Sequence, residues 1–269
     1  MADQTKTALI TGASSGIGRE LANCFAQDKY NLILVALEPD LLDKAASELR
    51  QQFGVEVTTM TKDLFKRDAP FEVYNEIKAK GTQIDVLVND AGQGQYGTFD
   101  TTDIQRELDI IQLNIGAYVV FTKLYLQEFI ARNEGKILLV GSIAGELPGP
   151  LQAVYHGTKA FVNSFAESIQ EENKDSNITI TNLLPGITKT DFFNKAHMTQ
   201  AKNVADGSGM EPAEVAKDGY KALMAGEHRI ISGVMNNVQV GFSKVMPDPL
   251  VAANVHKQSA PVDGNESAR

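Results

Sequence analysis

The sequence alternates between short apolar runs and longer segments in which apolar residues recur at helical spacing. The short runs predict strands at residues 7–11, 32–37, 55–60, 84–89, 136–141, 178–184 and 229–232. The longer segments predict helices at 16–28, 41–53, 104–130, 155–173 and 212–225. Strand–helix alternation is typical of a parallel sheet whose right-handed crossovers place helices on both faces. The sequence therefore predicts an α/β fold built on a doubly wound parallel sheet.

Length and periodicity favour one large domain. A chain of 269 residues can bury a sizeable core, and we find no linker, repeat or low-complexity segment that would divide it. We expect the domain to span residues 1–243 and the aperiodic residues 244–269 to form an irregular C-terminal tail. The long irregular interval between Pro185 and Pro212 predicts a substrate lid at about 187–211.

Charge and cysteine content exclude several classes of protein. The net charge of −9 argues against a nucleic-acid partner, and no basic run suggests a membrane surface. Residues 1–6 lack the apolar core of a signal peptide, so we expect a cytoplasmic location and no membrane partner. Cys24 is the single cysteine and the histidines lack ligand spacing, so no metal is expected.

A glycine-rich turn follows the first predicted strand and opens the first helix. It reads Thr11-Gly12-Ala13-Ser14-Ser15-Gly16-Ile17-Gly18, with the spacing Gly-x3-Gly-x-Gly. Glycines permit a tight turn and close approach to a pyrophosphate, and the helix N-terminus offers free N–H groups. A purely structural turn is the alternative, but its position after the first strand favours a nucleotide site. We therefore expect a Rossmann-like domain in which this turn, from Gly12 to Gly18, binds a dinucleotide.

The end of the second strand bears on the choice between NAD and NADP. Glu38 lies twenty positions after Gly18, where an acid can bond a ribose 2′-hydroxyl. No arginine stands at 37 or 38 to bind a 2′-phosphate, which a carboxylate would repel; Arg19 is the only nearby guanidinium. NAD is therefore favoured over NADP, with a solvated role for Glu38 at the helix entry as the alternative.

Tyr155 and Lys159 lie four positions apart in the predicted helix 155–173, so they share one helix face. A free tyrosine has a pKa of about 10, and a neighbouring positive charge favours the phenolate. A tyrosine tuned in this way can exchange a proton with a carbinol or carbonyl oxygen near neutral pH. A coincidental pair on a surface helix is the alternative, and the neighbouring motifs decide between the two.

Taken together and in order, these motifs resemble those of the short-chain dehydrogenase/reductase family from about residue 5 to residue 235. The matching pieces are the turn from Thr11 to Gly18, Asp63-Leu64, Asn89-Asp90-Ala91-Gly92, Asn114, Ser142, Tyr155-x3-Lys159, and Pro185-Gly186 with Thr190. Each falls at a predicted strand end or on the expected helix. The resemblance implies a nicotinamide cofactor, NAD or NADP, and hydride transfer.

The resemblance also implies catalytic roles for four residues. Ser142 would bond the substrate oxygen, and Tyr155 would be the general acid in reduction and the base in oxidation. Lys159 would lower the pKa of Tyr155 and hold the nicotinamide ribose. Asn114 would hold a water that links Lys159 to solvent. A turn-capping role for Ser142 and an ordinary polar role for Asn114 are the alternatives.

Further residues would contact the cofactor by the same resemblance. Asp63 and Leu64 match positions beside the adenine, and Asn89, Ala91 and Gly92 match a stabilising turn beside the adenosine. Pro185, Gly186, Ile187 and Thr190 match positions near the carboxamide and phosphates. Asp90 departs from the common family form, which has a second asparagine there, so we expect a changed local hydrogen-bond pattern.

The predicted lid carries Phe192, Phe193, Met198, Val204 and Met210. They favour a substrate with apolar bulk near its carbonyl, or else they anchor the loop to the core. The segment 93–99, with Tyr96 and Phe99, is expected to form the opposite wall.

The segment 104–130 is either one helix or two separated near Gly116, and from Ile110 to Ile130 it is apolar on nearly every face. A helix of this kind is buried on more than one side. Because equivalent helices of the resembled family meet across subunits, the resemblance implies a homodimer or homotetramer, with a monomer whose helix is well covered as the alternative.

We conclude from the sequence that the chain interconverts an alcohol and a ketone or aldehyde, with Tyr155 as general acid/base. A catalytically silent NAD(P)-binding regulatory or scaffold protein is the first alternative. An NAD-using epimerase or dehydratase is the second, disfavoured by the spacing of Gly12, Gly16 and Gly18 and by the chain length.

Overall fold

The computed structural model describes residues 5–262 and contains a seven-stranded parallel sheet with strand order β3-β2-β1-β4-β5-β6-β7. The strands are β1 (Thr7–Thr11), β2 (Asn31–Ala36), β3 (Val57–Thr61), β4 (Val86–Asn89), β5 (Gly135–Val140), β6 (Ile178–Leu184) and β7 (Arg229–Ile231). All neighbouring strands run parallel. The predicted doubly wound α/β fold is confirmed.

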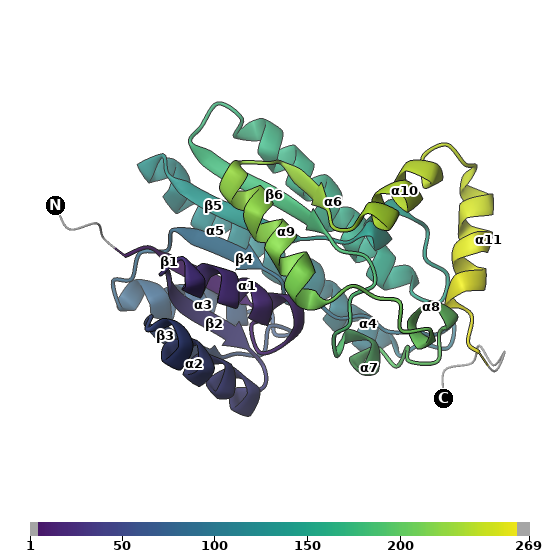
Figure 1. Cartoon of the computed structure of the whole chain (residues 1–269), viewed down its shortest axis with the longest axis horizontal. Coiled ribbons are helices and arrows are strands. Elements are labelled where there is room, and N and C mark those ends of the chain that lie inside the picture. Colours follow the sequence, from purple (N-terminus) through teal and green to yellow (C-terminus); the bar gives the residue numbers. More distant parts are fainter. Residues whose placement is uncertain (1–4, 263–269) are drawn as a thin grey trace.

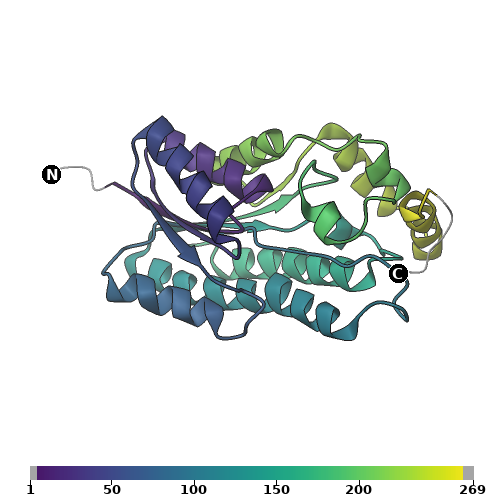
Figure 2. The ribbon, with the colours of Figure 1, turned by 90° about the horizontal axis from the view of Figure 1, so that it is seen from below.

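Helices cover both faces of the sheet (Figures 1 and 2). One face carries α1 (Gly16–Gln27), α2 (Pro39–Phe53) and α9 (Pro212–Ala225). The other carries α3 (Ala69–Ala79), α5 (Ala117–Arg132) and α6 (Ala153–Glu172). Successive strand side chains point to opposite faces, so Ala8 and Ile10 enter the first core and Leu9 the second. This double burial explains why β1 reads as a continuous apolar run.

The chain winds outward from β1 through β2 to β3 and then returns to form β4 on the other side of β1. Loops that leave β1 and β4 therefore diverge, and a crevice opens at their carboxyl ends. The lid elements α7 (Phe192–Lys195) and α8 (Lys202–Ala205) lie at this end of the molecule (Figure 1).

The segment predicted as one or two helices over 104–130 is continuous but changes its winding. α4 (Ile104–Ile111) passes into a π-helical turn, Gln112–Gly116, and then into α5. A π-turn inserts an extra residue per turn, which rotates the side chains that follow, and such turns are frequent at functional sites. Here the turn contains Asn114.

The expectation of an irregular tail over 244–269 is wrong for residues Asp248–Ser259, which form helix α11. α10 (Val234–Ser243) precedes it, and α11 packs against α8. Val251, Val255 and Ser259 are buried, and the Tyr96 hydroxyl donates to the Ser259 carbonyl at 2.6 Å. Residues 263–269 of the predicted tail lie outside the described residues. Within residues 5–262, no helix is both long and apolar enough to span a membrane.

Candidate active site

A cavity of about 730 Å³ occupies the crevice at the carboxyl ends of the strands. This volume is typical of a site that encloses a small organic ligand. The cavity is lined by sixteen of the predicted residues: Gly12, Ser14, Ser15, Gly16, Ile17, Glu38, Leu64, Ala91, Gly92, Ser142, Tyr155, Lys159, Pro185, Gly186, Ile187 and Thr190. The loops after the first six strands, β1 to β6, thus converge on one cavity.

The glycine-rich turn packs so closely that side chains would not fit at two of its positions. Gly12 has a φ of +71°, and a Cβ there would lie 2.9 Å from the backbone of Ala91. A Cβ on Gly18 would lie 2.6 Å from the Gly12 carbonyl oxygen. Real Cβ atoms do not approach backbone atoms so closely, so the turn requires glycine at both positions. Gly18 therefore packs against the backbone of the turn and does not line the cavity.

The N-terminus of α1 faces this turn, and the Asp90 carboxylate occupies one of its N–H groups, that of Gly18. The Ser15 side chain, at the N-cap position, makes no cap hydrogen bond to any described residue, and the first turn of α1 contains no acidic residue. The N–H groups of Gly16 and Ile17 at this end of the twelve-residue helix are therefore open to an anion such as a pyrophosphate.

Glu38, at the end of β2, does not stand free in the cavity. Its Oε1 lies 2.5 Å from the Nζ of Lys195 on α7, and its Oε2 accepts a hydrogen bond from the Ser14 hydroxyl at 3.3 Å. Burial alone would raise the pKa of Glu38, but the hydrogen bond and charge of Lys195 outweigh it and lower the pKa. The carboxylate form is therefore favoured at this corner of the cavity.

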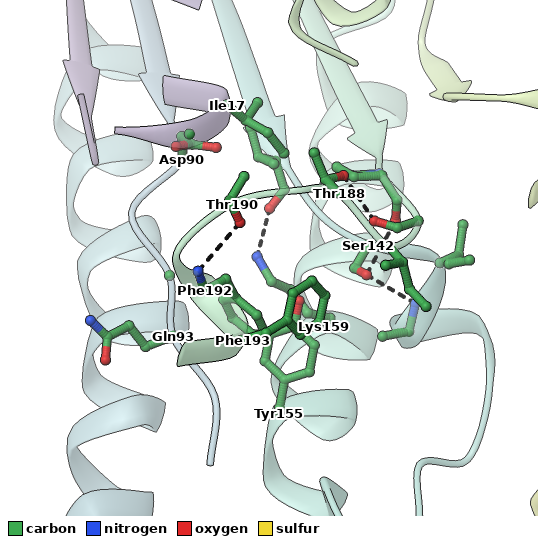
Figure 3. A pocket seen from close by; sticks show the side chains of 18 of the residues that line it. Ile17, Asp90, Gln93, Ser142, Tyr155, Lys159, Thr188, Thr190, Phe192 and Phe193 are labelled. Atoms are coloured by element: carbon green, nitrogen blue, oxygen red, sulfur yellow. Dashed lines mark hydrogen bonds between the residues drawn. The ribbon is translucent and has the colours of Figure 1, made fainter. Parts of the chain in front are cut away.

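Tyr155 and Lys159 project from the same face of α6 into the cavity, next to Phe192 and Phe193 (Figure 3). The ring centroids of Tyr155 and Phe192 lie 5.0 Å apart. Burial raises the pKa of Tyr155 to about 12, although its hydrogen bond with Ser142 acts in the opposite direction. The expected net lowering of this pKa is therefore wrong for the protein without ligand, because the cost of burying a phenolate dominates.

The Lys159 ammonium is directed at the main chain as well as at the cavity. Its side chain is 4% exposed, and Nζ donates to the Val140 carbonyl at 2.8 Å. Nζ also lies 5.5 Å from the centroid of the Tyr118 ring. Burial lowers the pKa of Lys159 to about 8, although the negative charge of Asp90 favours the ammonium. Lys159 therefore loses its proton at a pH that is only slightly above neutral.

Ser142 makes the turn cap that was weighed as its alternative role, and it also lines the cavity. Its Oγ accepts a hydrogen bond from the Ala144 N–H at 3.0 Å, which caps the short 3₁₀ helix Ile143–Glu146. Its hydroxyl also donates to the Pro185 carbonyl at 3.4 Å, and the residue lines the cavity. The cap fixes the position of the hydroxyl beside Tyr155.

Asn114, in the π-turn, does not line the cavity but is completely buried behind it. Its Nδ2 donates to the Gln93 carbonyl and to Thr158 Oγ1, each at 2.9 Å, and its Oδ1 accepts from the Gln93 N–H at 3.0 Å. Asn114 thus ties the loop after β4 to α6. The predicted role in proton supply stays a prediction.

Two other predicted cofactor residues lie away from the cavity. Asn89 is completely buried, and its Nδ2 donates to Thr122 Oγ1 at 3.1 Å, which supports the predicted stabilising position. Asp63 Oδ1 accepts a hydrogen bond from the Phe65 N–H at 3.1 Å and closes a turn. The cofactor contacts of both residues, and the catalytic roles above, stay predictions.

Several polar lining residues were not among the predicted site residues, and they include Asp90, Lys195 and Gln152. Asp90 lies under the glycine turn, where burial raises its pKa to about 7 while the Lys159 charge and the Gly18 N–H favour the carboxylate. Its unusual identity within the motif was the available signal. Lys195 and Gln152 also line the cavity, and no sequence spacing marks them.

Two roles were proposed for the apolar lid residues, contact with the substrate and anchoring of the loop to the core, and the structure places different residues in positions for each. Phe192, Phe193 and Met198 line the cavity, and they also pack with the buried residues Tyr96, Leu151, Ala196 and Ala201 in a small satellite core. Val204 belongs to this core only. Phe99, expected in the opposite wall, is 64% exposed and does not line the cavity.

Comparison with known proteins places this geometry in a family. The profile of the family described as short chain dehydrogenase matches residues 6–201, which is most of the chain. The chain belongs to this family. The predicted resemblance is therefore confirmed, and with it the assignment to the Rossmann-fold oxidoreductases of this family.

Individual relatives agree with the family assignment. A very-long-chain 3-oxoacyl-CoA reductase from Laccaria bicolor is 36% identical over 180 residues, which cover 65% of this chain and 53% of the relative. The match thus spans about half the length of that protein. A short-chain dehydrogenase structure from Sphingobium yanoikuyae in complex with NADPH has a TM-score of 0.79 and 28% identity, covering 90% of this chain and 96% of that one. A 7beta-hydroxysteroid dehydrogenase structure shares the fold, with a TM-score of 0.84 at 20% identity, covering 93% and 96%.

Proposed function

We propose that this chain is an NAD(P)-dependent oxidoreductase that interconverts an alcohol and a ketone or aldehyde, with Tyr155 as the general acid/base. The observation that carries the proposal is the convergence of Tyr155, Ser142 and Lys159 on one cavity that also contains a glycine-rich turn. A phenol, a hydroxyl and an ammonium can together bond, protonate and stabilise one substrate oxygen.

The residues of the turn fit a dinucleotide. The glycines at 12 and 18 leave no room for a side chain, and the open N–H groups of α1 can bind a pyrophosphate. A nicotinamide cofactor, when bound, supplies the hydride chemistry. The family neighbour that binds NADPH supports this assignment. Glu38 favours NAD because its carboxylate can accept hydrogen bonds from the ribose hydroxyls.

Each reacting group has a defined task in the reducing direction. Tyr155, with its raised pKa, keeps its proton at neutral pH and donates it to the carbonyl oxygen. Ser142 bonds the same oxygen and shares a hydrogen bond with Tyr155, which stabilises the phenolate that forms. The Lys159 ammonium, inside the same low-dielectric wall, favours that charge. In oxidation the same groups act in reverse.

The apolar lining favours a substrate with apolar bulk beside its carbonyl. Phe192, Phe193 and Met198 from the lid, Met235 from α10 and Val255 from α11 line the cavity. Burial of apolar surface contributes about 25 cal/mol per Å², so such a wall selects a large apolar group. The relatives named 3-oxoacyl-CoA reductase support a ketone, with a 3-oxoacyl thioester as the first candidate. A cytoplasmic location and a homodimer or homotetramer complete the proposal.

A substrate screen tests this function. Purified protein is mixed with NADH or NADPH and a panel of ketones and aldehydes that includes 3-oxoacyl thioesters, and oxidation of the cofactor is followed with the alcohol product. We expect one alcohol formed per cofactor oxidised, and Ser142→Ala should slow turnover about a hundredfold. Cofactor binding without turnover on any carbonyl would favour the silent binding protein. Product formed without net oxidation would favour the epimerase.

A further inference from the structure

The lid crosses the cavity and contacts the end of β2. Helix α7 begins at Phe192, which packs on Tyr155, and ends at Lys195, which pairs with Glu38. The side chains of Lys195 and Glu38 are 31% and 34% exposed, so the pair lies at the cavity wall rather than in bulk solvent. The lid therefore places a cation at the corner where Glu38 would bind the adenosine ribose.

Glu38 and Lys195 form a small charged cluster with the glycine turn. The Ser14 hydroxyl donates to the second carboxylate oxygen of Glu38, and Lys195 Nζ also lies 4.0 Å from Asp191 Oδ2. Lys62, another lysine that lines the cavity, already pairs with Glu72 at 3.0 Å and with Glu76. The ammonium of Lys195 is thus the positive charge directed at Glu38.

The cluster changes what the corner can bind. A lone glutamate accepts hydrogen bonds from ribose hydroxyls and repels a 2′-phosphate. An ionised carboxylate has about four acceptor sites, so Glu38 can bond a ribose hydroxyl while it still holds Lys195. A 2′-phosphate would gain a charge-assisted hydrogen bond from the Lys195 ammonium, which offsets the repulsion by Glu38.

Building on the nicotinamide cofactor proposed above, we propose that Lys195 is a specificity-determining residue. It allows the site to accept the 2′-phosphate of NADP(H) despite Glu38, so that the chain binds both NAD(H) and NADP(H). Glu38 and Lys195 then set the preference together, one from the turn between β2 and α2 and the other from the lid.

Dissociation constants of NADH and NADPH, measured by nucleotide fluorescence without substrate, test this role. In the wild type we expect the two constants to lie within about tenfold of each other. Lys195→Met should weaken NADPH about tenfold and NADH less than about threefold, because only NADPH loses a charge-assisted bond. Lys195→Arg should retain the wild-type ratio, and Glu38→Gln should shift the ratio toward NADPH.

Lys189→Met provides the matched control, because Lys189 lies on the same loop but pairs with Glu211 at 2.8 Å and does not line the cavity. It should leave both constants unchanged. An equal loss of NADH and NADPH binding in Lys195→Met, or no loss of either, would overturn the role of Lys195. Failure of the wild type to bind either nucleotide would instead refute the proposed function itself.

Discussion

Asp90 and Lys159 are two charged side chains at the cavity that also contains Tyr155 and Ser142, and each affects the ionisation of the other. Burial raises the pKa of Asp90 to about 7 and lowers that of Lys159 to about 8. Their opposite charges act against burial, since Asp90 favours the ammonium and Lys159 favours the carboxylate. Asp90 also raises the pKa of Tyr155 and of the buried Tyr118. A substitution of Asp90 should therefore change the pKa values of Lys159 and Tyr155 while it leaves both side chains in place.

We predict that turnover in the reducing direction declines as the pH rises through about 8, where Lys159 loses its proton. Asp90→Asn should move this decline to lower pH, because the amide no longer favours the ammonium and the pKa of Lys159 falls further. The measurement is the pH profile of kcat in wild type and variant. Asp109→Asn, which removes a half-buried charge on α4 outside the cavity, should leave the profile unchanged. A decline at the same or higher pH in Asp90→Asn would contradict the coupling.

At the scale of elements, the turn between β1 and α1 depends on its glycines for two separate reasons. Gly12 needs a positive φ, and it also has the backbone of Ala91 2.9 Å from its Cβ position. Gly54, which ends α2, has a similar φ of +67° but no atom within 4 Å of its Cβ position among the described residues. A comparison of substitutions at Gly12 and Gly54 therefore distinguishes the cost of a positive φ from the cost of steric crowding.

We predict that Gly54→Ala lowers the free energy of unfolding by about 1 kcal/mol, the cost of a left-handed alanine. Gly12→Ala should cost at least about 2–3 kcal/mol, because alanine there must also displace backbone atoms. Urea denaturation with a common m-value measures both. Equal losses in the two variants would show that the close approach at Gly12 does not constrain the turn.

The sequence predicted the strands better than it predicted the π-turn and helix α11. The central strands were predicted because parallel strands buried on both faces read as nearly uninterrupted apolar runs, whereas the edge strand β3 contains exposed positions. The π-turn at Gln112–Gly116 was not, because one extra residue per turn leaves the apolar pattern almost unchanged. Helix α11 was missed because only a narrow face, including Val251 and Val255, is buried against the rest of the chain.

At the scale of the whole molecule, the site combines residues that the sequence marks with residues that only the fold brings together. The meeting of the turn that begins at Gly12 with the Tyr155–Lys159 pair at one cavity could be predicted, because both belong to an ordered set of motifs along the chain. The pairing of Lys195 with Glu38 could not, because 157 positions separate the two residues. The raised pKa of Tyr155 was also unpredictable, because burial is a property of the packed domain.

We propose that Tyr155 supplies the proton within a cavity whose other residues bind the cofactor. The decisive experiment measures both turnover and the cofactor dissociation constant in Tyr155→Phe. We predict a loss of turnover of at least about a thousandfold, with cofactor binding within about threefold of wild type, because phenylalanine keeps the ring and removes only the hydroxyl. Turnover within tenfold of wild type in that variant would contradict the claim.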